Sequence, residues 1–258
     1  MGCRRLEFVP ADPRACSHSP LRGLEAGTRS GHSSGVSLPS SEIALTPSQQ
    51  TQLEQFLELL LEANSRFNLT ALRERGVAWE RHVLESLRLV PLLGEARSLL
   101  DLGSGGGLPG MVLAIARPEL AVTLLEASTK KARFLADASR ALGLQNVVVD
   151  CRRAEHAAAP REPLREHFDV VTARAVAALP VLLELSVPFV RVGGHILAVK
   201  GERASEELAD AQAAMHALHV ELEKSERHPS ATVLVLVKRG ATPGQFPRRS
   251  GEPGRKPL

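Results

Sequence analysis

The sequence predicts an α/β fold in which a mostly parallel, seven-stranded sheet carries helices on both faces. Two observations predict it. Short apolar runs typical of buried strands alternate with helical patterns over residues 96–238, and this alternation is typical of parallel sheets. Glycines 103, 105, 106 and 107 then separate the first strand from the first helix. Such a turn lets backbone approach a ligand closely beside a helix N-terminus, as in nucleotide-binding folds.

Length and composition divide the chain into four parts. Its 258 residues are 43% hydrophobic, enough for one substantial domain with extensions. Residues 1–42 are rich in Ser, Gly, Pro and Arg and are expected to be disordered. Residues 43–95 form a helical lead-in and residues 96–238 a Rossmann-like core, together one domain. Residues 239–258 are a basic tail.

Charge and cysteine content restrict the partners and the compartment. The net charge is +3, and residues 238–258 hold six Lys or Arg against one acid. Such a tail either binds a polyanion or is simply solvated. Three cysteines without metal-site spacing favour a reducing compartment. No apolar run reaches the roughly 20 residues of a membrane span, and no signal peptide is evident, so we expect a cytoplasmic protein without a membrane partner.

The lead-in, residues 43–95, is expected to form two helices. Thr46-Pro47-Ser48-Gln49 has an N-cap, a proline at the first helical position and a glutamine at the third, which predicts a helix start. Apolar residues recur at helical spacing as far as Asn64. Residues 67–70 follow as a loop, and a second helix is expected over residues 76–90.

The core is expected to alternate strands and helices. Strands are predicted at 98–102, 122–126, 147–150, 168–172 and 195–200, and helices at 109–116, 130–142, 179–190 and 204–218. Gly193-Gly194 is expected to form a turn. Two last strands, 220–225 and 231–238, are expected to pair antiparallel at one edge of the sheet.

The glycine turn favours S-adenosylmethionine over a dinucleotide. Gly105-x-Gly107-x-x-Gly110 satisfies the dinucleotide pattern, but a lone match is weak. Here the turn begins at Gly103, and Pro109 interrupts the pattern. A shorter turn with no pyrophosphate to bind suits S-adenosylmethionine, and Asp101 before it could face the amino group of that ligand.

Other candidate ligand residues follow the later strands. Glu126 ends the second strand, where an acid accepts hydrogen bonds from ribose hydroxyls of either cofactor. Ala154 and Glu155 follow the third strand, where an adenine would lie. Arg174 follows the fourth strand, at the sheet edge where such folds bind ligands, and could hold a carboxylate or phosphate.

Further cations are candidates for binding an anionic partner. Lys200-Gly201 ends the fifth strand on the same edge. Lys130, Lys131 and Arg133 open a helix, where cations are unfavourable without an external anion.

The sequence disfavours several reactions. It shows neither a Ser/His/Asp arrangement nor a His/Cys metal spacing, so no metal is expected. Cys151 lacks a preceding proline, which disfavours methylation at C5 of pyrimidines. No Asn/Asp-Pro-Pro-aromatic segment is present, which disfavours methylation of exocyclic amines.

Several segments resemble one known family, the bacterial 16S rRNA guanine-N7 methyltransferases, also called glucose-inhibited division protein B. The similarity covers about residues 46–258 and is carried by the following segments: Arg66-Phe67-Asn68-Leu69-Thr70-Ala71, Arg81-His82-x-x-Glu85-Ser86-Leu87, Leu100 to Gly110, Lys131-x-Arg133-Phe134-Leu135, Phe168-Asp169-x-x-x-x-Arg174-Ala175, Gly193-Gly194, Lys200-Gly201 and Phe246-Pro247-Arg248-Arg249-x-Gly251-x-Pro253. The Asn-Leu-Thr-Ala and Gly-Leu-Pro-Gly segments together are specific to this family.

The resemblance implies a class I methyltransferase that uses S-adenosylmethionine to methylate N7 of a guanine in 16S rRNA or the small ribosomal subunit. It implies cofactor contacts at Gly103, Leu108, Glu126, Ala154, Glu155 and Arg174. It implies rRNA contacts at Asn68, Arg81, His82, Lys130, Arg133, Lys200, Arg248 and Arg249. Guanine N7 has a lone pair and no proton, so transfer needs positioning rather than a base, with Arg174 and Lys200 as candidates to assist. We expect a monomer.

Two departures and three alternatives remain. Glu85 stands where the family usually has Asp, and residues 1–42 have no counterpart in the family. The alternatives are a methyltransferase with a non-rRNA substrate, an NAD(P) oxidoreductase, and a non-catalytic rRNA-binding assembly factor.

Overall fold

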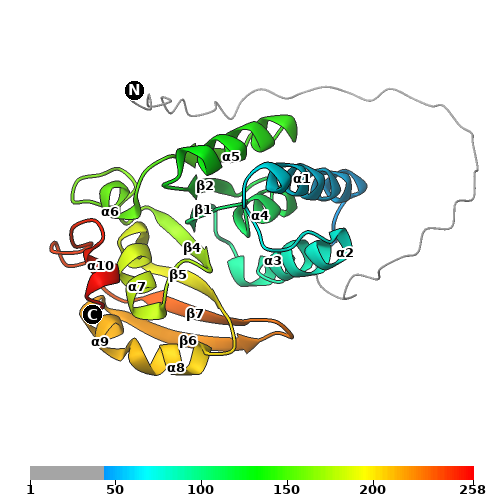
Figure 1. Ribbon diagram of the computed structural model, residues 1–258. Helices are drawn as coiled ribbons and strands as arrows, with labels where there is room; N and C mark the ends of the chain where they lie inside the picture. The colour runs from blue at the N-terminus through cyan, green and yellow to red at the C-terminus, as the bar shows by residue number, and fades with distance from the viewer. Residues whose placement is uncertain (1–43) are drawn as a thin grey trace, which may run out of the picture. The chain divides into compact units, whose positions relative to one another are not determined.

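The computed structural model describes residues 44–258, in which one seven-stranded sheet carries helices on both faces (Figure 1). The strand order is β3-β2-β1-β4-β5-β7-β6. The predicted fold class and the position of the last strand pair at one edge are confirmed. The extension predicted for residues 1–42 lies outside the described residues.

Five parallel strands form most of the sheet. They are β3 (Val147–Asp150), β2 (Ala121–Leu125), β1 (Ser98–Leu102), β4 (Phe168–Arg174) and β5 (Val190–Lys200). Leu102 pairs with Leu125 on one side and Ala173 on the other. The carboxyl ends of β1, β2 and β4 therefore lie side by side, at the edge where parallel α/β sheets bind ligands.

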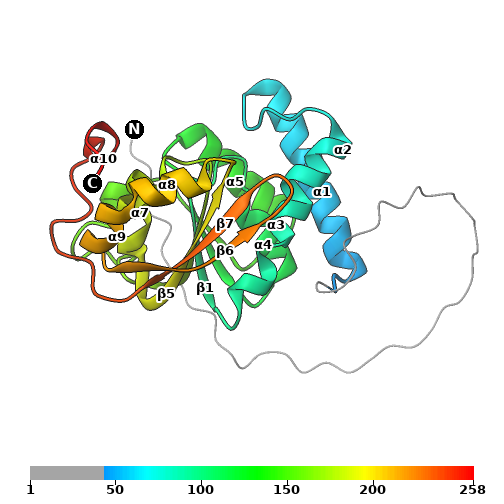
Figure 2. The same cartoon turned by 90° about the horizontal axis from the view of Figure 1, so that it is seen from below.

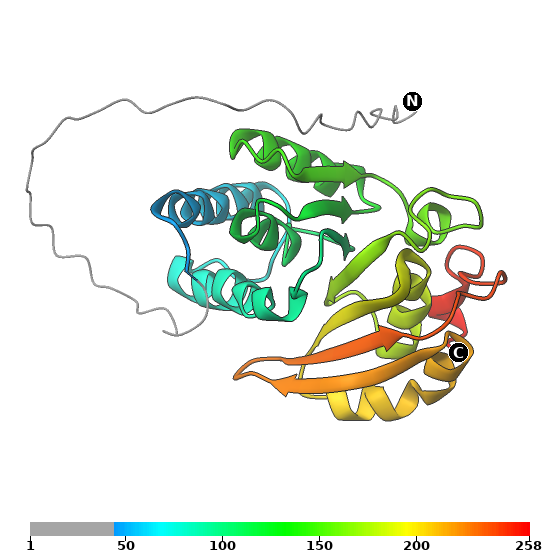
Figure 3. The ribbon, with the colours of Figure 1, turned by 180° about the vertical axis from the view of Figure 1, so that it is seen from behind.

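The antiparallel pair closes the other end of the sheet. β7 (Thr232–Lys238) lies between β5 and β6 (Val220–Arg227) and is antiparallel to both. Because Thr232 pairs with Lys200, the β6–β7 turn returns to the carboxyl end of β5. Figure 3 shows the tip of this hairpin near the lead-in helices.

Two hydrophobic cores flank the sheet, because side chains of a strand alternate between its faces. Leu99 of β1 belongs to one core and Leu100 to the other. Helices of the first face are α1 (Pro47–Arg66), α4 (Gly110–Ala116) and α5 (Thr129–Ala141). Helices of the second face are α6 (Ala154–Ala157), α7 (Leu179–Ser186), α8 (Ala204–Asp210) and α9 (Gln212–Ala217). Figure 2 shows the two groups at opposite sides of the strands.

The start of α1 both caps the helix and attaches it to the core. Thr46 Oγ1 accepts a hydrogen bond from Gln49 N–H, while the Gln49 side chain accepts from Thr46 N–H. The same side chain donates to the carbonyls of Ile115 and Ala116 at the end of α4. The predicted capping box is therefore confirmed, and it also places α1 against α4.

The second lead-in helix is interrupted rather than continuous. It consists of α2 (Arg75–Ala78), the π-helical segment η1 (Trp79–Leu84) and α3 (Glu85–Leu87), and a 3₁₀ turn, η2 (Val90–Leu93), follows. A π-helical turn changes the direction in which the following side chains point and is frequent at functional sites. Here it directly precedes Glu85.

Two details of the predicted core are wrong. Gly193-Gly194 is not a turn between elements but lies inside β5, where the pairing jumps from Phe168 with Val190 to Val170 with His195. A Cβ on Gly194 would lie 2.7 Å from the Asp169 carbonyl oxygen, so glycine permits this bulge. The helix predicted over 204–218 is divided at Ala211 into α8 and α9. The short helix η3 (Val187–Phe189) completes the segment after α7.

The basic tail is folded onto the second face of the sheet. Phe246 is buried in that core, and Arg165 donates hydrogen bonds to the carbonyls of Phe246 and Thr242. Arg248 donates to both carboxylate oxygens of Glu184, which is fully buried. A final helix, α10 (Glu252–Arg255), follows. The alternative of a simply solvated tail is therefore wrong for this part of the chain.

The two adjacent arginines of the tail, Arg248 and Arg249, allow a test of this anchoring. Arg248→Ala leaves the carboxylate of Glu184 buried without its cation, and breaking a buried ion pair costs about 3–5 kcal/mol. Arg249 is exposed, so Arg249→Ala should change the free energy of unfolding by about 0.5 kcal/mol or less. Urea unfolding followed by circular dichroism measures both, and equal effects of the two substitutions would contradict the anchoring role of Arg248.

Asp169 connects the starts of β1 and β4. Its carboxylate accepts hydrogen bonds from Arg97 N–H, Ser98 N–H and the Ser98 hydroxyl, and from Arg191 Nε at 2.7 Å. Burial alone raises the pKa of Asp169, but these donors, Arg191 foremost, outweigh it and lower the pKa to about 2. Because the folded pKa lies below the unfolded one of about 3.9, this carboxylate stabilises the fold above about pH 4.

We expect Asp169→Asn to lower the free energy of unfolding by about 2 kcal/mol at pH 7. The difference from the unsubstituted protein should fall by roughly half at pH 3, since the contribution is lost as the pH decreases from about 4 to about 2. Urea titrations at both pH values measure this. Asp137→Asn, at an exposed carboxylate of α5, is the control, and an effect of Asp169→Asn that is equal at pH 3 and pH 7 would refute the assignment.

Candidate functional site

The glycine turn after β1 is open to a ligand at its start. Gly103 and Gly105 have φ values of +65° and +56°, which side chains other than glycine rarely adopt. Gly103 is exposed, and a Cβ there would lie 3.1 Å from Val176 Cγ2 in the loop after β4. The N–H groups of Gly103 and Ser104 donate to the Leu125 carbonyl at the end of β2. The turn therefore presents bare backbone between the ends of three strands.

The end of the turn, at Gly110, allows α4 to pack closely against β1. A Cβ on Gly110 would lie 2.8 Å from the side chain of Asp101, so α4 can approach β1 this closely only with glycine. Leu108 is half-buried against the first core and joins Pro109 through a cis peptide bond. The dinucleotide-like spacing thus mixes two roles, ligand access at Gly103 and helix packing at Gly110.

Asp101 is part of the core rather than of the ligand surface. Its carboxylate is fully buried, with Oδ1 accepting from the Thr172 hydroxyl at 2.9 Å and Oδ2 from Gly110 N–H at 3.2 Å. Burial raises the pKa of Asp101 to about 6. Because the side chain is 0% exposed, the expectation that Asp101 faces a ligand amino group is wrong for this structure.

Glu126 follows β2 as predicted and connects two loops. One carboxylate oxygen accepts from Gly105 N–H at 2.9 Å and the other from Ser128 N–H at 2.7 Å. The residue is 8% exposed. Each carboxylate oxygen can accept more than one hydrogen bond. Glu126 can therefore hold the glycine turn in place and still accept hydrogen bonds from the two hydroxyls of a ribose.

Glu155 lies at the start of α6 and contacts the tail. It accepts hydrogen bonds from Gly251 N–H at 2.9 Å, from the Ser250 hydroxyl and from Arg153. Burial opposes ionisation, but these donors outweigh it and lower the pKa of Glu155. Ala154, beside it, is half-buried. The segment predicted to lie near an adenine is thus tied to the C-terminal segment.

Arg174, at the end of β4, joins the sheet to the lead-in. Its Nη2 donates to the Arg81 carbonyl at 2.8 Å and lies 3.5 Å from both His82 Nδ1 and Glu85 Oε2. Burial lowers the pKa of Arg174. His82 Nε2 lies 2.6 Å from the Thr70 hydroxyl. Burial and the charge of Arg174 lower the pKa of His82 to about 4, so the imidazole is neutral at pH 7.

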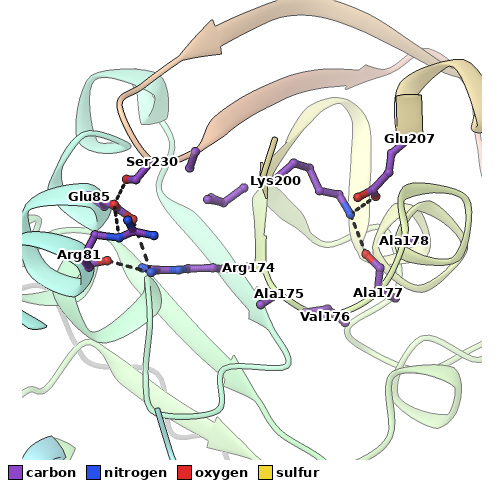
Figure 4. Close-up of a pocket in the computed structure, with 13 residues that line it drawn as sticks. Arg81, Glu85, Arg174, Ala175, Val176, Ala177, Ala178, Lys200, Glu207 and Ser230 are labelled. Atoms are coloured by element: carbon purple, nitrogen blue, oxygen red, sulfur yellow. Dashed lines mark hydrogen bonds and ion pairs between the residues drawn. The ribbon is translucent and has the colours of Figure 1, made fainter. Parts of the chain in front are cut away.

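A cavity of about 410 Å³ lies beside this cluster. Figure 4 shows Arg81, Glu85 and Arg174 on one side and Lys200 with Glu207 on the other. Lys200, 7% exposed, donates to Glu207 Oε2 at 2.7 Å and to the Ala177 carbonyl at 2.6 Å. Residues 175–178 form the segment between them. Because Val176 also lies against Gly103, the cavity and the glycine turn share one loop.

The other residues predicted to contact RNA lie in two separate places. Asn68 and Arg133 are exposed, and Lys130 Nζ lies 4.4 Å from the ring centre of Phe67, next to Asn68. Arg249 is exposed on the tail, but Arg248 is engaged by Glu184. The structure thus groups Arg81, His82 and Arg174, places Lys200 across the cavity, and leaves the tail arginines elsewhere.

Several residues of the site were not predicted, among them the following four. Val176, Glu207 and Ser230 line the cavity, and Ser230 donates a hydrogen bond to Glu85 from the β6–β7 turn. Asn64 is buried and accepts from the N–H groups of Leu69 and Thr70, which shapes the loop before η1. Only Asn64 carried a signal, because a polar residue at a helix end before a loop is typical of such a role.

Residues 44–258 contain no group of three or more His, Cys, Asp or Glu that could hold a metal ion. In the same residues, no helix is long and apolar enough to cross a membrane.

Solved structures share the fold. An O-methyltransferase from Bacillus cereus, crystallised with SAH, aligns with a TM-score of 0.53 at 20% identity, over 71% of this chain and 90% of that one. A putative O-methyltransferase from Klebsiella pneumoniae gives a TM-score of 0.52 at 18% identity, over 71% and 90%. At these identities the similarity establishes the class I methyltransferase fold alone.

Curated relatives are much closer in sequence. Ribosomal RNA small subunit methyltransferase G of Sorangium cellulosum is 45% identical over 83% of this chain and 87% of its own length. The protein of the same name from Thermotoga neapolitana is 44% identical over 81% and 93%. The family model described as rRNA small subunit methyltransferase G matches residues 49–231. The resemblance found in the sequence is therefore confirmed, and the chain belongs to the rRNA small subunit methyltransferase G family.

Proposed function

We propose that this protein transfers a methyl group from S-adenosylmethionine to N7 of a guanine in 16S rRNA of the small ribosomal subunit. The observation that carries the proposal is the base-sized cavity beside the glycine turn, with Val176 adjoining both. Binding sites for small molecules have volumes of about 300–1,000 Å³, so a cavity of about 410 Å³ can admit a purine. Family membership supports the same reading.

The residues around the glycine turn fit S-adenosylmethionine, which supplies a methyl group activated on a positively charged sulfur. The bare backbone at Gly103 leaves room for a ligand, and Glu126 is placed to accept hydrogen bonds from its ribose hydroxyls. Leu108, Ala154 and Glu155 follow the same strand ends and remain candidates for further contacts with it.

The chain needs no general base for this reaction, because guanine N7 attacks with a lone pair and loses no proton. His82 is neutral and both of its ring nitrogens face protein groups, so it serves structure rather than proton transfer. The task of the protein is to align the base with the methyl group, and such orientation can supply about 7–11 kcal/mol of a barrier. Arg174 and Lys200 border the space in which that base would lie.

Exposed cations, together with the neutral Asn68, are proposed to bind the RNA backbone. Asn68, Arg81, Lys130, Arg133 and Arg249 are exposed, and phosphate contacts of this kind position a nucleic acid without reading its sequence. His82 and Arg248 would act indirectly, through the loop and the tail that they hold. We expect the enzyme to act as a monomer in the cytoplasm, where this substrate is assembled.

Gly103→Asp should abolish methyl transfer and S-adenosylmethionine binding. The new side chain would occupy the open side of the turn, in a left-handed backbone conformation and against Val176. Calorimetry with S-adenosylmethionine and with NADH measures binding. Gly244→Asp is the matched control, because a Cβ there meets nothing within 4 Å. Binding of NADH but not S-adenosylmethionine to the unsubstituted protein would contradict the proposed cofactor.

Arg174→Ala should reduce methyl transfer below detection, since it removes the cation that borders the cavity and connects the lead-in to β4. The measurement is incorporation of tritiated methyl into 16S rRNA from a strain that lacks this enzyme, followed by mapping of the modified base. Arg140→Ala, at an exposed arginine of α5, is the control. Wild-type transfer to another atom or to protein, or binding to the small subunit without any transfer, would refute the proposed reaction.

A further inference from the structure

We propose that Glu85 reads the Watson–Crick edge of the target guanine and stabilises the base as it becomes positively charged. This inference rests on the proposed function and adds the residue that selects guanine. Glu85 lines the cavity from the lead-in side, where its side chain is 12% exposed. A carboxylate kept this far from water can discriminate between bases, because an unmatched buried polar group is costly.

The contacts of Glu85 leave one oxygen available. Oε1 lies 3.0 Å from Arg81 Nε and accepts the hydrogen bond from Ser230. Among the described residues no hydrogen bond reaches Oε2, and its ion pair with Arg174 Nη2 spans 3.5 Å, which is too long for a good hydrogen bond. Three separate segments therefore orient the carboxylate while Oε2 keeps its capacity to accept.

The chemistry of guanine matches this arrangement. Its Watson–Crick edge presents two adjacent donors, N1–H and the 2-amino group, which a carboxylate can accept together. Adenine has no proton at N1, so it offers no such pair. N7 lies on a different edge of the purine, and a base held through N1 and the 2-amino group keeps N7 free to attack.

The positive charge that develops on the purine during the reaction also favours Glu85. When N7 forms its bond to carbon, the purine ring becomes cationic and N1–H becomes a stronger donor. A carboxylate already placed at N1–H then binds the charged ring more tightly than the neutral one, and stabilisation of developing charge is what accelerates a reaction.

Glu207, the other carboxylate of the cavity, is a weaker candidate. Its Oε2 already accepts two short hydrogen bonds, from Lys200 Nζ at 2.7 Å and from Leu179 N–H at 2.8 Å, whereas no hydrogen bond reaches Oε2 of Glu85. Glu207 also lies on α8 and pairs with Lys200 at the end of β5, whereas Glu85 pairs with Arg174 at the end of β4, which is the direct neighbour of β1 in the sheet. The glycine turn follows β1, so Glu85 lies nearer to the place where the methyl group is delivered.

The test compares two substrates, 16S rRNA with guanosine and with inosine at the modified position. Inosine keeps N1–H and N7 but lacks the 2-amino group. For the wild-type enzyme we expect kcat/KM to be about tenfold higher with guanosine, the ratio that corresponds to about 1.4 kcal/mol. In Glu85→Ala and in Glu85→Gln, which keeps the size of the side chain, the ratio should fall close to one. Effects of inosine on RNA folding are the same for every enzyme and cancel from the comparison.

Glu80→Gln is the matched control, because Glu80 is exposed on the π-helical segment that directly precedes Glu85 and does not line this cavity; it should keep the tenfold ratio. Where a Glu85 variant melts normally but is inactive, the ratio of dissociation constants for the two RNAs replaces kcat/KM. A wild-type ratio near one, or an unchanged ratio in both Glu85 variants, overturns the role of Glu85. Absence of N7-methylguanosine from the wild-type product instead overturns the proposed function.

Discussion

The ion and hydrogen-bond cluster around Glu85 is the contact on which the arrangement of the site depends. It joins Arg81 from the lead-in, Arg174 from the end of β4 and Ser230 from the β6–β7 turn. These segments lie far apart in the sequence, and each brings a charged or polar group to the same carboxylate. Removing Glu85 would leave the half-buried guanidinium of Arg174 without its carboxylate, and removing one partner of a buried pair costs more than the pair contributes. The cavity exists because these segments converge there.

The glycine turn depends on a second set of internal bonds. Glu126 binds the N–H of Gly105, and Asp101 binds that of Gly110, so two carboxylates fix the start and the end of the turn. Burial separates the two roles: Asp101 is 0% exposed and can only hold structure, whereas Glu126, at 8%, retains some exposure at the sheet edge and can do both. A ligand would therefore meet a turn whose shape is already set.

Much of the fold follows from local patterns, whereas the site does not. The strand Ser98–Leu102 and the helix start at Thr46 are as predicted, because a buried apolar run and a capping box act within a few residues. The π-helical turn before Glu85 carries no such local signal. Neither does the approach of Ser230, whose position depends on the length and twist of a whole hairpin. Arg248 looked like part of a free basic tail because its partner, Glu184, is 64 residues away.

The charges around the cavity explain how one protein can bind a polyanion and still present a site for a neutral base. Arg174 lies beside Glu85, and Lys200 beside Glu207, so the two carboxylates offset two of the three cations that line the cavity. A phosphate would find both cations already partnered. A purine that acquires positive charge during transfer would instead find carboxylates within reach. The attraction for RNA phosphates instead comes from exposed side chains such as Lys130 and Arg249, whose charges act at the surface.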